Sequence, residues 1–144
     1  MLQKLLIGID NDVEKNGVCL YYSKNSFELL NLTFFELFDK LYFLKDCENL
    51  DIEVVIEAGW LNKSNWHKVT NGSAAINANI GLRTGANHEV GRKIVEMCQY
   101  LGLKHHLIKP TKSKVNAETF KAITKYQGRT NSEMRDSCLL VYGR

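Results

Sequence analysis

Two short apolar runs, each ended by an acidic residue, constrain the fold of this chain more than any other feature. Residues 5–9 are followed by Asp10, and residues 52–56 are followed by Glu57. Compact apolar runs of this length are typical of central strands that are covered on both faces. A helix is expected between the two runs, which favours parallel pairing of the strands. Neighbouring strands lie about 4.8 Å apart, so Asp10 and Glu57 would lie side by side at the carboxyl edge of the sheet.

The chain around these runs predicts an α/β arrangement. The β-rich segments 18–22 and 27–32 follow the turn dipeptide Asn16-Gly17, so we expect an antiparallel meander. The further elements expected are a helix capped by Thr33 and Glu36 that ends near Cys47, a long surface excursion over 58–85, a helix from Asn87 to a C-cap at Gly102, a strand over 105–108, and helices over 117–126 and 132–142.

Composition limits the classes of protein that fit. A chain of 144 residues with 44% hydrophobic residues has the size of one domain with one core. The net charge of +3 permits a polyanionic partner without indicating one. Cys19, Cys47, Cys98 and Cys138 are scattered without a C-x-x-C pair, which fits reduced thiols in a cytoplasmic protein. No apolar run approaches the roughly 18 residues of a membrane span, and no signal peptide is evident, so we expect a soluble, unexported protein.

A third acid, Asp136, lies in the final expected helix. Leu139 and Leu140 follow it by three and four residues, which places Asp136 on or beside the apolar face of that helix. A charged group in such a position needs a partner. The partner is either a metal ion or an arginine such as Arg92 or Arg129 in a buried ion pair.

The adjacent carboxylates of Asp10 and Glu57 predict a cation site. Two such groups repel each other unless one is protonated or a cation lies between them, and hard oxygen ligands suit Mg²⁺ or Mn²⁺. The alternative is that each acid opens a solvated turn at the end of its strand. Glu133 has a structural explanation of its own, because it forms a second capping box with Thr130.

The order β-β-β-α-β-α-β-α and the motifs around the three acids resemble RuvC-type Holliday junction endonucleases of the ribonuclease-H-like superfamily. The motifs are G-I-D at 8–10, I-E-A at 56–58 and R-D-S-C-L-L-V at 135–141. The resemblance spans nearly the whole chain. It implies a single α/β domain over residues 1–144, with three layers and a mixed five-stranded sheet of order 3-2-1-4-5 flanked by helices.

This resemblance also implies an activity. It predicts a metal-dependent endonuclease that hydrolyses phosphodiester bonds in branched or structured DNA with two Mg²⁺ or Mn²⁺ ions. Asp10, Glu57 and Asp136 would hold the metal, and Glu133 would be a further catalytic acid at the i, i+3 spacing of the family. A homodimer is expected, since a Holliday junction has two-fold symmetry.

The sequence departs from the family pattern at three places, one of which is Glu133, where an aspartate usually begins the final helix. The other two lie in loops near the acids. Asn11-Asp12 stands where small residues or glycine usually follow the first acid, and the basic segment 109–114 replaces a glycine-bearing loop. Both departures bear on substrate preference. Gly17, in contrast, stands where a glycine is common in the second strand of the family.

Basic and aromatic residues near the carboxylate edge are candidates for DNA contact. Lysine and arginine bind phosphates, and tryptophan stacks on exposed bases. The alternative is that the charges only solubilise the surface and the tryptophans pack inward. The candidate nucleic-acid-binding residues are Trp60, Lys63, Trp66, Lys68, Arg83, Lys112, Lys114 and Lys121.

Two rival functions fit the same residues. One is a non-catalytic nucleic-acid-binding or assembly module that keeps the fold without metal, because a fold does not determine a function. The other is a ribonuclease H or a single-strand nuclease, because readout of the nucleic-acid backbone leaves little local signature in a sequence.

Overall fold

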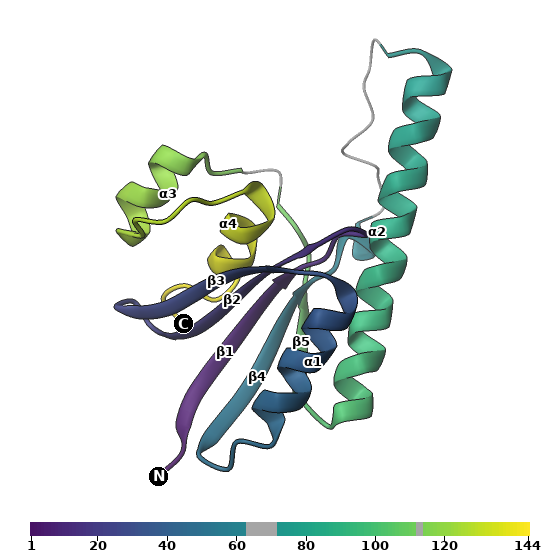
Figure 1. Ribbon diagram of the computed structural model, residues 1–144. Coiled ribbons are helices and arrows are strands. Elements are labelled where there is room, and N and C mark those ends of the chain that lie inside the picture. Colours follow the sequence, from purple (N-terminus) through teal and green to yellow (C-terminus); the bar gives the residue numbers. More distant parts are fainter. Residues whose placement is uncertain (63–71, 112–113) are drawn as a thin grey trace.

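The computed structural model, which describes residues 1–62, 72–111 and 114–144, is built around one five-stranded mixed sheet (Figure 1). The strand order is β3-β2-β1-β4-β5, as predicted. β1 pairs antiparallel with β2 and parallel with β4, while β3 and β5 form the two edges. The strands are β1 (Gln3–Asp10), β2 (Asn16–Ser23), β3 (Ser26–Leu32), β4 (Leu50–Glu57) and β5 (Lys104–Ile108).

Helices cover both faces of the sheet and give the expected three layers (Figure 1). α1 and α2 lie on one face, and α4 lies on the other with α3 beside it. The helices are α1 (Phe34–Lys45), the 3₁₀ turn η1 (Gly59–Leu61), α2 (Ala74–Leu101), α3 (Ala117–Thr124) and α4 (Ser132–Leu139).

The central strand β1 contributes side chains to two separate cores. Leu5, Ile7 and Ile9 pack toward α1 and α2, whereas Leu6 packs toward α3 and α4 beside Phe120. Successive side chains of a strand point to opposite faces, so a strand buried on both faces must be apolar throughout. The expectation that the run 5–9 is covered on both sides is therefore confirmed.

Local signals in the sequence were right at α1 and wrong at the start of β2. Both hydrogen bonds of the predicted capping box between Thr33 and Glu36 are present at the start of α1. Asn16 and Gly17, in contrast, lie inside β2, and Gly17 does not have a positive φ. Asn16 is fully buried, accepts a hydrogen bond from the amide of Asp12 and donates one to the carbonyl of Leu32. Asn16 thus ties the β1–β2 connection to the sheet.

The predicted surface excursion over 58–85 is only partly correct, because α2 begins at Ala74. The hydroxyl of Ser73 accepts a hydrogen bond from the amide of Ile76 and caps the helix. The N-terminal half of α2 extends beyond the carboxyl edge of the sheet (Figure 1). This half has little core to face, so its sequence lacks the apolar period that would reveal a helix.

The other helix ends agree with the predictions to within a few residues. Gly102, with φ 69°, ends α2 as expected. α3 ends at Thr124 instead of residue 126, because Lys125 takes a left-handed conformation with φ 63°. α4 ends at Leu139, before the predicted residue 142. All four cysteines are free thiols, and no helix in the described part of the chain is long and apolar enough to cross a membrane.

The backbone of α4 lies directly on β1 and β2. A Cβ atom placed on Gly8 would lie 2.1 Å from the carbonyl oxygen of Ser137, and one placed on Gly17 would lie 2.1 Å from the carbonyl oxygen of Glu133. Such distances leave no space for any side chain. The two glycines therefore permit the close approach that brings α4 to the carboxyl end of β1.

We expect Gly17→Ala to lower the free energy of unfolding by about 3 kcal/mol, because the new methyl group must push α4 off the sheet. Gly85→Ala is the matched control, since a Cβ on Gly85 meets nothing within 4 Å. In the helix α2 this change should raise stability by up to about 1 kcal/mol. Urea unfolding of the three proteins gives the comparison, and equal stability of Gly17→Ala and the wild type would contradict the close contact.

Candidate metal centre

The register of β1 and β4 places two acids next to each other at the end of the sheet. Ile9 pairs with Ile56 in the parallel ladder, so the following residues, Asp10 and Glu57, lie side by side at the carboxyl edge. The sequence predicted this juxtaposition from the two apolar runs. It depends only on strand pairing, which is why a local pattern was sufficient to find it.

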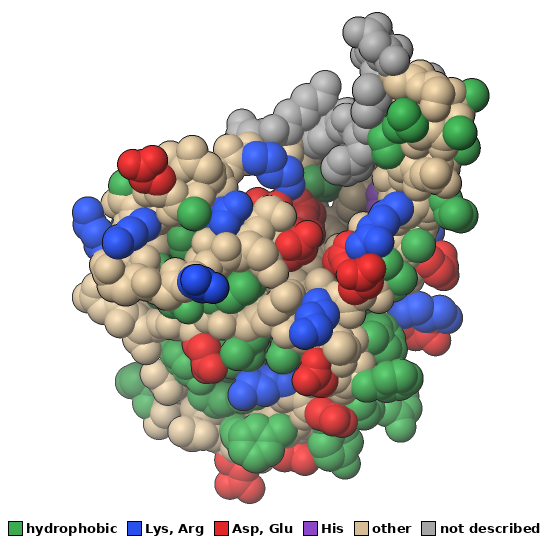
Figure 2. All heavy atoms as spheres, turned by 45° about the horizontal axis from the view of Figure 1, so that its top comes forward, with side chains coloured by type: hydrophobic (Ala, Val, Ile, Leu, Met, Phe, Trp, Pro, Cys, Tyr) green, Lys and Arg blue, Asp and Glu red, His purple; other side chains and the backbone are tan. Residues whose placement is uncertain are grey.

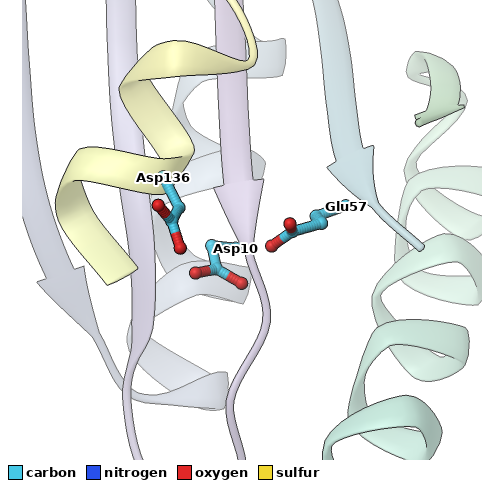
Figure 3. Close-up of side chains that lie close together, drawn as sticks. All are labelled: Asp10, Glu57 and Asp136. Atoms are coloured by element: carbon cyan, nitrogen blue, oxygen red, sulfur yellow. The ribbon is translucent and has the colours of Figure 1, made fainter. Parts of the chain in front are cut away.

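The third acid, Asp136, reaches the same place from α4. One carboxylate oxygen each from Asp10, Glu57 and Asp136 lie within 4.8 Å of one another. Figure 3 shows the three side chains pointing toward one another from β1, β4 and α4. The side chain of Asp136 is only 13% exposed. We call these three residues the acid cluster.

The reason given from the sequence for the position of Asp136 was partly wrong. Leu139 is 36% exposed, and the buried residues of α4 are Ser137 and Cys138. Leu140 is buried but lies just beyond the helix. The face of α4 that meets the sheet therefore carries small side chains, which fits its close approach to Gly8.

The acid cluster is electrostatically unfavourable without a cation. Burial raises the pKa of Asp10 well above its ordinary value. A hydrogen bond with Glu57 and the negative charges of Glu57 and Asp136 raise this pKa further, while the positive charge of Lys114 lowers it. Asp10 thus tends to keep a proton unless a cation lies against it.

The described cation nearest to the cluster is a lysine. The ammonium of Lys114 donates a hydrogen bond of 2.6 Å to Asp136. This corrects the alternative of a buried pair with Arg92 or Arg129, because neither forms an ion pair with Asp136 among the described residues. Arg92 pairs with Glu89 at 3.2 Å instead. Lys114 follows β5, and no local sequence pattern indicated that it pairs with Asp136.

The acid cluster lies in the wall of a cleft of about 1140 Å³. α2 and the β1–β2 connection line one side of the cleft, and the segment after β5 together with α4 lines the other. Figure 2 shows acidic side chains in and beside the hollow near the top of the view, with basic side chains at its margins. The partly buried carboxylates thus face a cleft large enough to admit a ligand.

Solved structures of RuvC are similar to this fold. RuvC from Thermus thermophilus in complex with a Holliday junction substrate matches with a TM-score of 0.52 and 10% sequence identity, over 95% of this chain and 89% of that one. A second structure of T. thermophilus RuvC matches with a TM-score of 0.50 and 11% identity, over 94% and 90% of the two chains. This chain has a RuvC-like fold. No protein-family model and no curated protein sequence matches it.

The resemblance inferred from the acid motifs is therefore confirmed at the level of the fold. At 10–11% identity, the likeness to RuvC concerns the architecture of the chain, because a fold does not determine a function.

Glu133 lines the cleft of this RuvC-like domain but is not part of the acid cluster. The predicted capping box with Thr130 is wrong, because the N-cap of α4 is Asn131, whose side chain accepts a hydrogen bond of 2.8 Å from the amide of Met134. The hydroxyl of Thr130 accepts a hydrogen bond from Arg135 instead. Two adjacent polar residues can both cap a helix, so the sequence did not distinguish them.

The β1–β2 connection, which departs from the family pattern, braces the cluster. Asn11 donates a hydrogen bond of 2.6 Å to the backbone carbonyl of Glu57 and so joins the ends of β1 and β4. Asn87 on α2 accepts a hydrogen bond of 2.9 Å from the amide of Val13. Sequence reasoning missed both asparagines as site residues. The sequence signal that could have identified Asn11 was its position next to Asp10. No sequence signal marked Asn87.

Arg83, a predicted DNA-binding residue, lies in the same wall and is already paired. Its guanidinium lies 3.4 Å from both Asp12 and Glu14, which tethers α2 to the β1–β2 connection. These neighbours raise the pKa of Arg83, mainly through the charge of Asp12. Its role in DNA binding stays a prediction.

The other predicted DNA contacts are spread over the molecule. Trp60 is half-buried and packs on the core under α2, where a Cβ on Gly91 would lie 2.4 Å from its ring and the guanidinium of Arg92 lies 5.6 Å from the ring centre. Lys114 lines the cleft, whereas Lys121 on α3 is exposed and does not. The predictions for Lys63, Trp66, Lys68 and Lys112 lie outside the described residues.

The raised pKa of Asp10 predicts how the stability of the metal-free protein depends on pH. Folding holds a proton on Asp10 that the unfolded chain releases, so stability falls as pH rises from about 3.9, the ordinary aspartate pKa, toward the raised value. Asp10→Asn removes this penalty. In chelator at about pH 8 we expect it to melt a few degrees above the wild type, with the difference lost near pH 4.

The exposed Asp39 on α1 supplies the control, because Asp39→Asn changes the same chemical group away from the acid cluster. Its melting temperature should follow the wild type at both pH values. If Asp10→Asn melts at or below the wild-type temperature at the higher pH, the electrostatic account of the cluster is wrong.

Proposed function

We propose that this protein is a divalent-metal-dependent endonuclease that hydrolyses phosphodiester bonds in branched DNA, in the manner of a Holliday junction resolvase. The observation that carries the proposal is the convergence of three carboxylates within 4.8 Å, on an open cleft of a RuvC-like fold. The sequence supports it independently, since the three acids occupy the motifs of the RuvC-type family in the same order.

The chemistry of the donor set fits Mg²⁺ or Mn²⁺. Asp10, Glu57 and Asp136 offer only carboxylate oxygens, which are the ligands that these hard cations prefer. The raised pKa of Asp10 supports the fit, because a cation would replace the proton that the crowded acids otherwise retain. Bound in a pair, such cations lower the pKa of water and stabilise negative charge on phosphate oxygens. Asp10 lies against both other acids and would hold the metal together with them.

Branched DNA is proposed as the substrate because T. thermophilus RuvC, which has a similar fold, has been solved with a Holliday junction substrate. A homodimer would present two acid clusters to the two-fold symmetric junction. Lys114 and Arg83 line the same cleft as the acid cluster and would contact phosphates there. The further proposed contacts are Trp60, Lys63, Trp66, Lys68, Lys112 and Lys121.

The proposal is tested by incubating the protein with a labelled four-way junction, duplex, single strand and RNA–DNA hybrid, each with Mg²⁺ or with chelator. We expect cleavage of the junction with Mg²⁺ only, and none by Asp10→Asn, because loss of a metal ligand would remove the catalytic cation. Circular dichroism checks that the variant is folded.

Two other outcomes would replace the proposal. Junction binding without cleavage in any metal would assign a non-catalytic binding module. Cleavage confined to the hybrid or to the single strand would assign a different nuclease of the same fold.

The position of Glu133 outside the acid cluster predicts that it contributes less than Asp136. Asp136→Asn should lower the cleavage rate by about 100-fold, whereas Glu133→Gln should lower it by less than about 10-fold, because a neighbour of the metal ligands can be changed at smaller cost. Single-turnover rates with Mg²⁺ give the comparison. Equal and complete loss of activity in both variants, with unchanged melting temperatures, would make Glu133 a metal ligand.

A further inference from the structure

Lys114 stands in an unusual relation to the acid cluster. Its ammonium lies 2.6 Å from a carboxylate oxygen of Asp136, whose side chain is only 13% exposed. Burial lowers the pKa of Lys114, but the hydrogen bond to Asp136 and the charges of Asp136, Glu57 and Asp10 raise it above its ordinary value. All three acids therefore act on this one ammonium group.

The side chain of Lys114 is otherwise largely exposed to solvent. Its side chain is 56% exposed, and the residue lies in the irregular segment between β5 and α3. A long flexible chain with an exposed stem can leave its partner at little cost once another charge takes over. The pair of Lys93 with Glu96 on α2 is an ordinary surface ion pair, because its atoms lie 3.1 Å apart and both side chains are more than half exposed. The pair of Lys114 with Asp136 differs in that its acid is largely buried.

We propose that Lys114 is a tethered cation that balances the acid cluster when metal is absent, and that a divalent cation must displace it from Asp136. The inference rests on the proposed metal-dependent function. The ammonium and the metal compete for the same carboxylates, and like charges at such distances repel strongly in a partly buried site. Lys114 thereby lowers the affinity of the site for metal.

The place of Lys114 in the cleft also determines where its ammonium group lies after displacement. Lys114 lines the same cleft as the acid cluster, so the released group stays in the cleft, where a phosphate of the substrate would meet it. The same side chain would thus serve the empty site as counter-ion and the loaded site as a phosphate contact. As it acts on metal through Asp136, it is a positioning residue and not a metal ligand.

Calorimetric titration of the full chain with Mn²⁺, without DNA, tests the proposal. We expect Lys114→Gln to bind Mn²⁺ about tenfold more tightly than the wild type, a modest effect because the ammonium is partly exposed to solvent. Lys114→Arg keeps the charge and should bind within about threefold of the wild type. Lys93→Gln, which removes a surface lysine of α2, should not change the affinity.

Thermal unfolding supplies a second readout. In chelator, Lys114→Gln should melt below the wild type because the acids lose their counter-ion, and saturating Mn²⁺ should raise its melting temperature by more than it raises that of the wild type. Metal binding by Lys114→Gln that is equal to or weaker than that of the wild type would overturn the proposal. So would the absence of Mn²⁺ binding by all variants.

The failure of this inference is distinguishable from failure of the proposed nuclease. A wild-type protein that binds Mn²⁺ and cuts junctions while Lys114→Gln gains no affinity would overturn the role of Lys114 alone. A gain in Mn²⁺ affinity by Lys114→Gln in a protein that cuts no substrate would support the role of Lys114 and contradict the nuclease.

Discussion

The acid cluster depends on the contact of the α4 backbone with β1 and β2. Strand pairing alone places Asp10 beside Glu57, but Asp136 comes from a helix of two turns on the other end of the chain. Such a short helix has little stability of its own and takes its position from what it packs on. Gly8 and Gly17 let its carbonyl groups meet the sheet without an intervening side chain. The third carboxylate therefore reaches the other two because two residues of the sheet lack side chains.

Bringing three carboxylates together opposes folding, and the remaining structure has to offset this. Two apolar cores, one on each face of the sheet, hold the ends of β1 and β4 in place. Asn11 bonds the end of β1 to the end of β4, and Lys114 places a positive charge against Asp136. Burial, a hydrogen bond with Glu57 and the negative charges of Glu57 and Asp136 still raise the pKa of Asp10 well above its ordinary value, although Lys114 lowers it. A site that remains unfavourable after folding is typical of places where a protein retains charge for a ligand instead of for stability.

Sequence reasoning succeeded where a structure follows from a local pattern. The apolar runs before Asp10 and Glu57 sufficed to predict parallel central strands, and hence their adjacency. It failed where the deciding contact joins distant segments. The N-terminal half of α2 has no core to face and so no apolar period, and Lys114 meets Asp136 only because the segment after β5 passes α4. The N-cap of α4 was misassigned to Thr130 because the side chain of the next residue was equally able to cap the helix.

The charges of the cleft impose an order on what can bind there. Among the described residues that line it, Arg83 pairs with Asp12, Lys114 pairs with Asp136, and Arg135 donates to backbone carbonyl groups. A phosphate approaching the metal-free cleft would therefore meet acids whose basic neighbours are already engaged. In the proposed displacement, a divalent cation would add positive charge at the acids and would free the ammonium of Lys114. If metal displaces Lys114 as proposed, metal would enter before a polyanion, and the release of this lysine would link the two events.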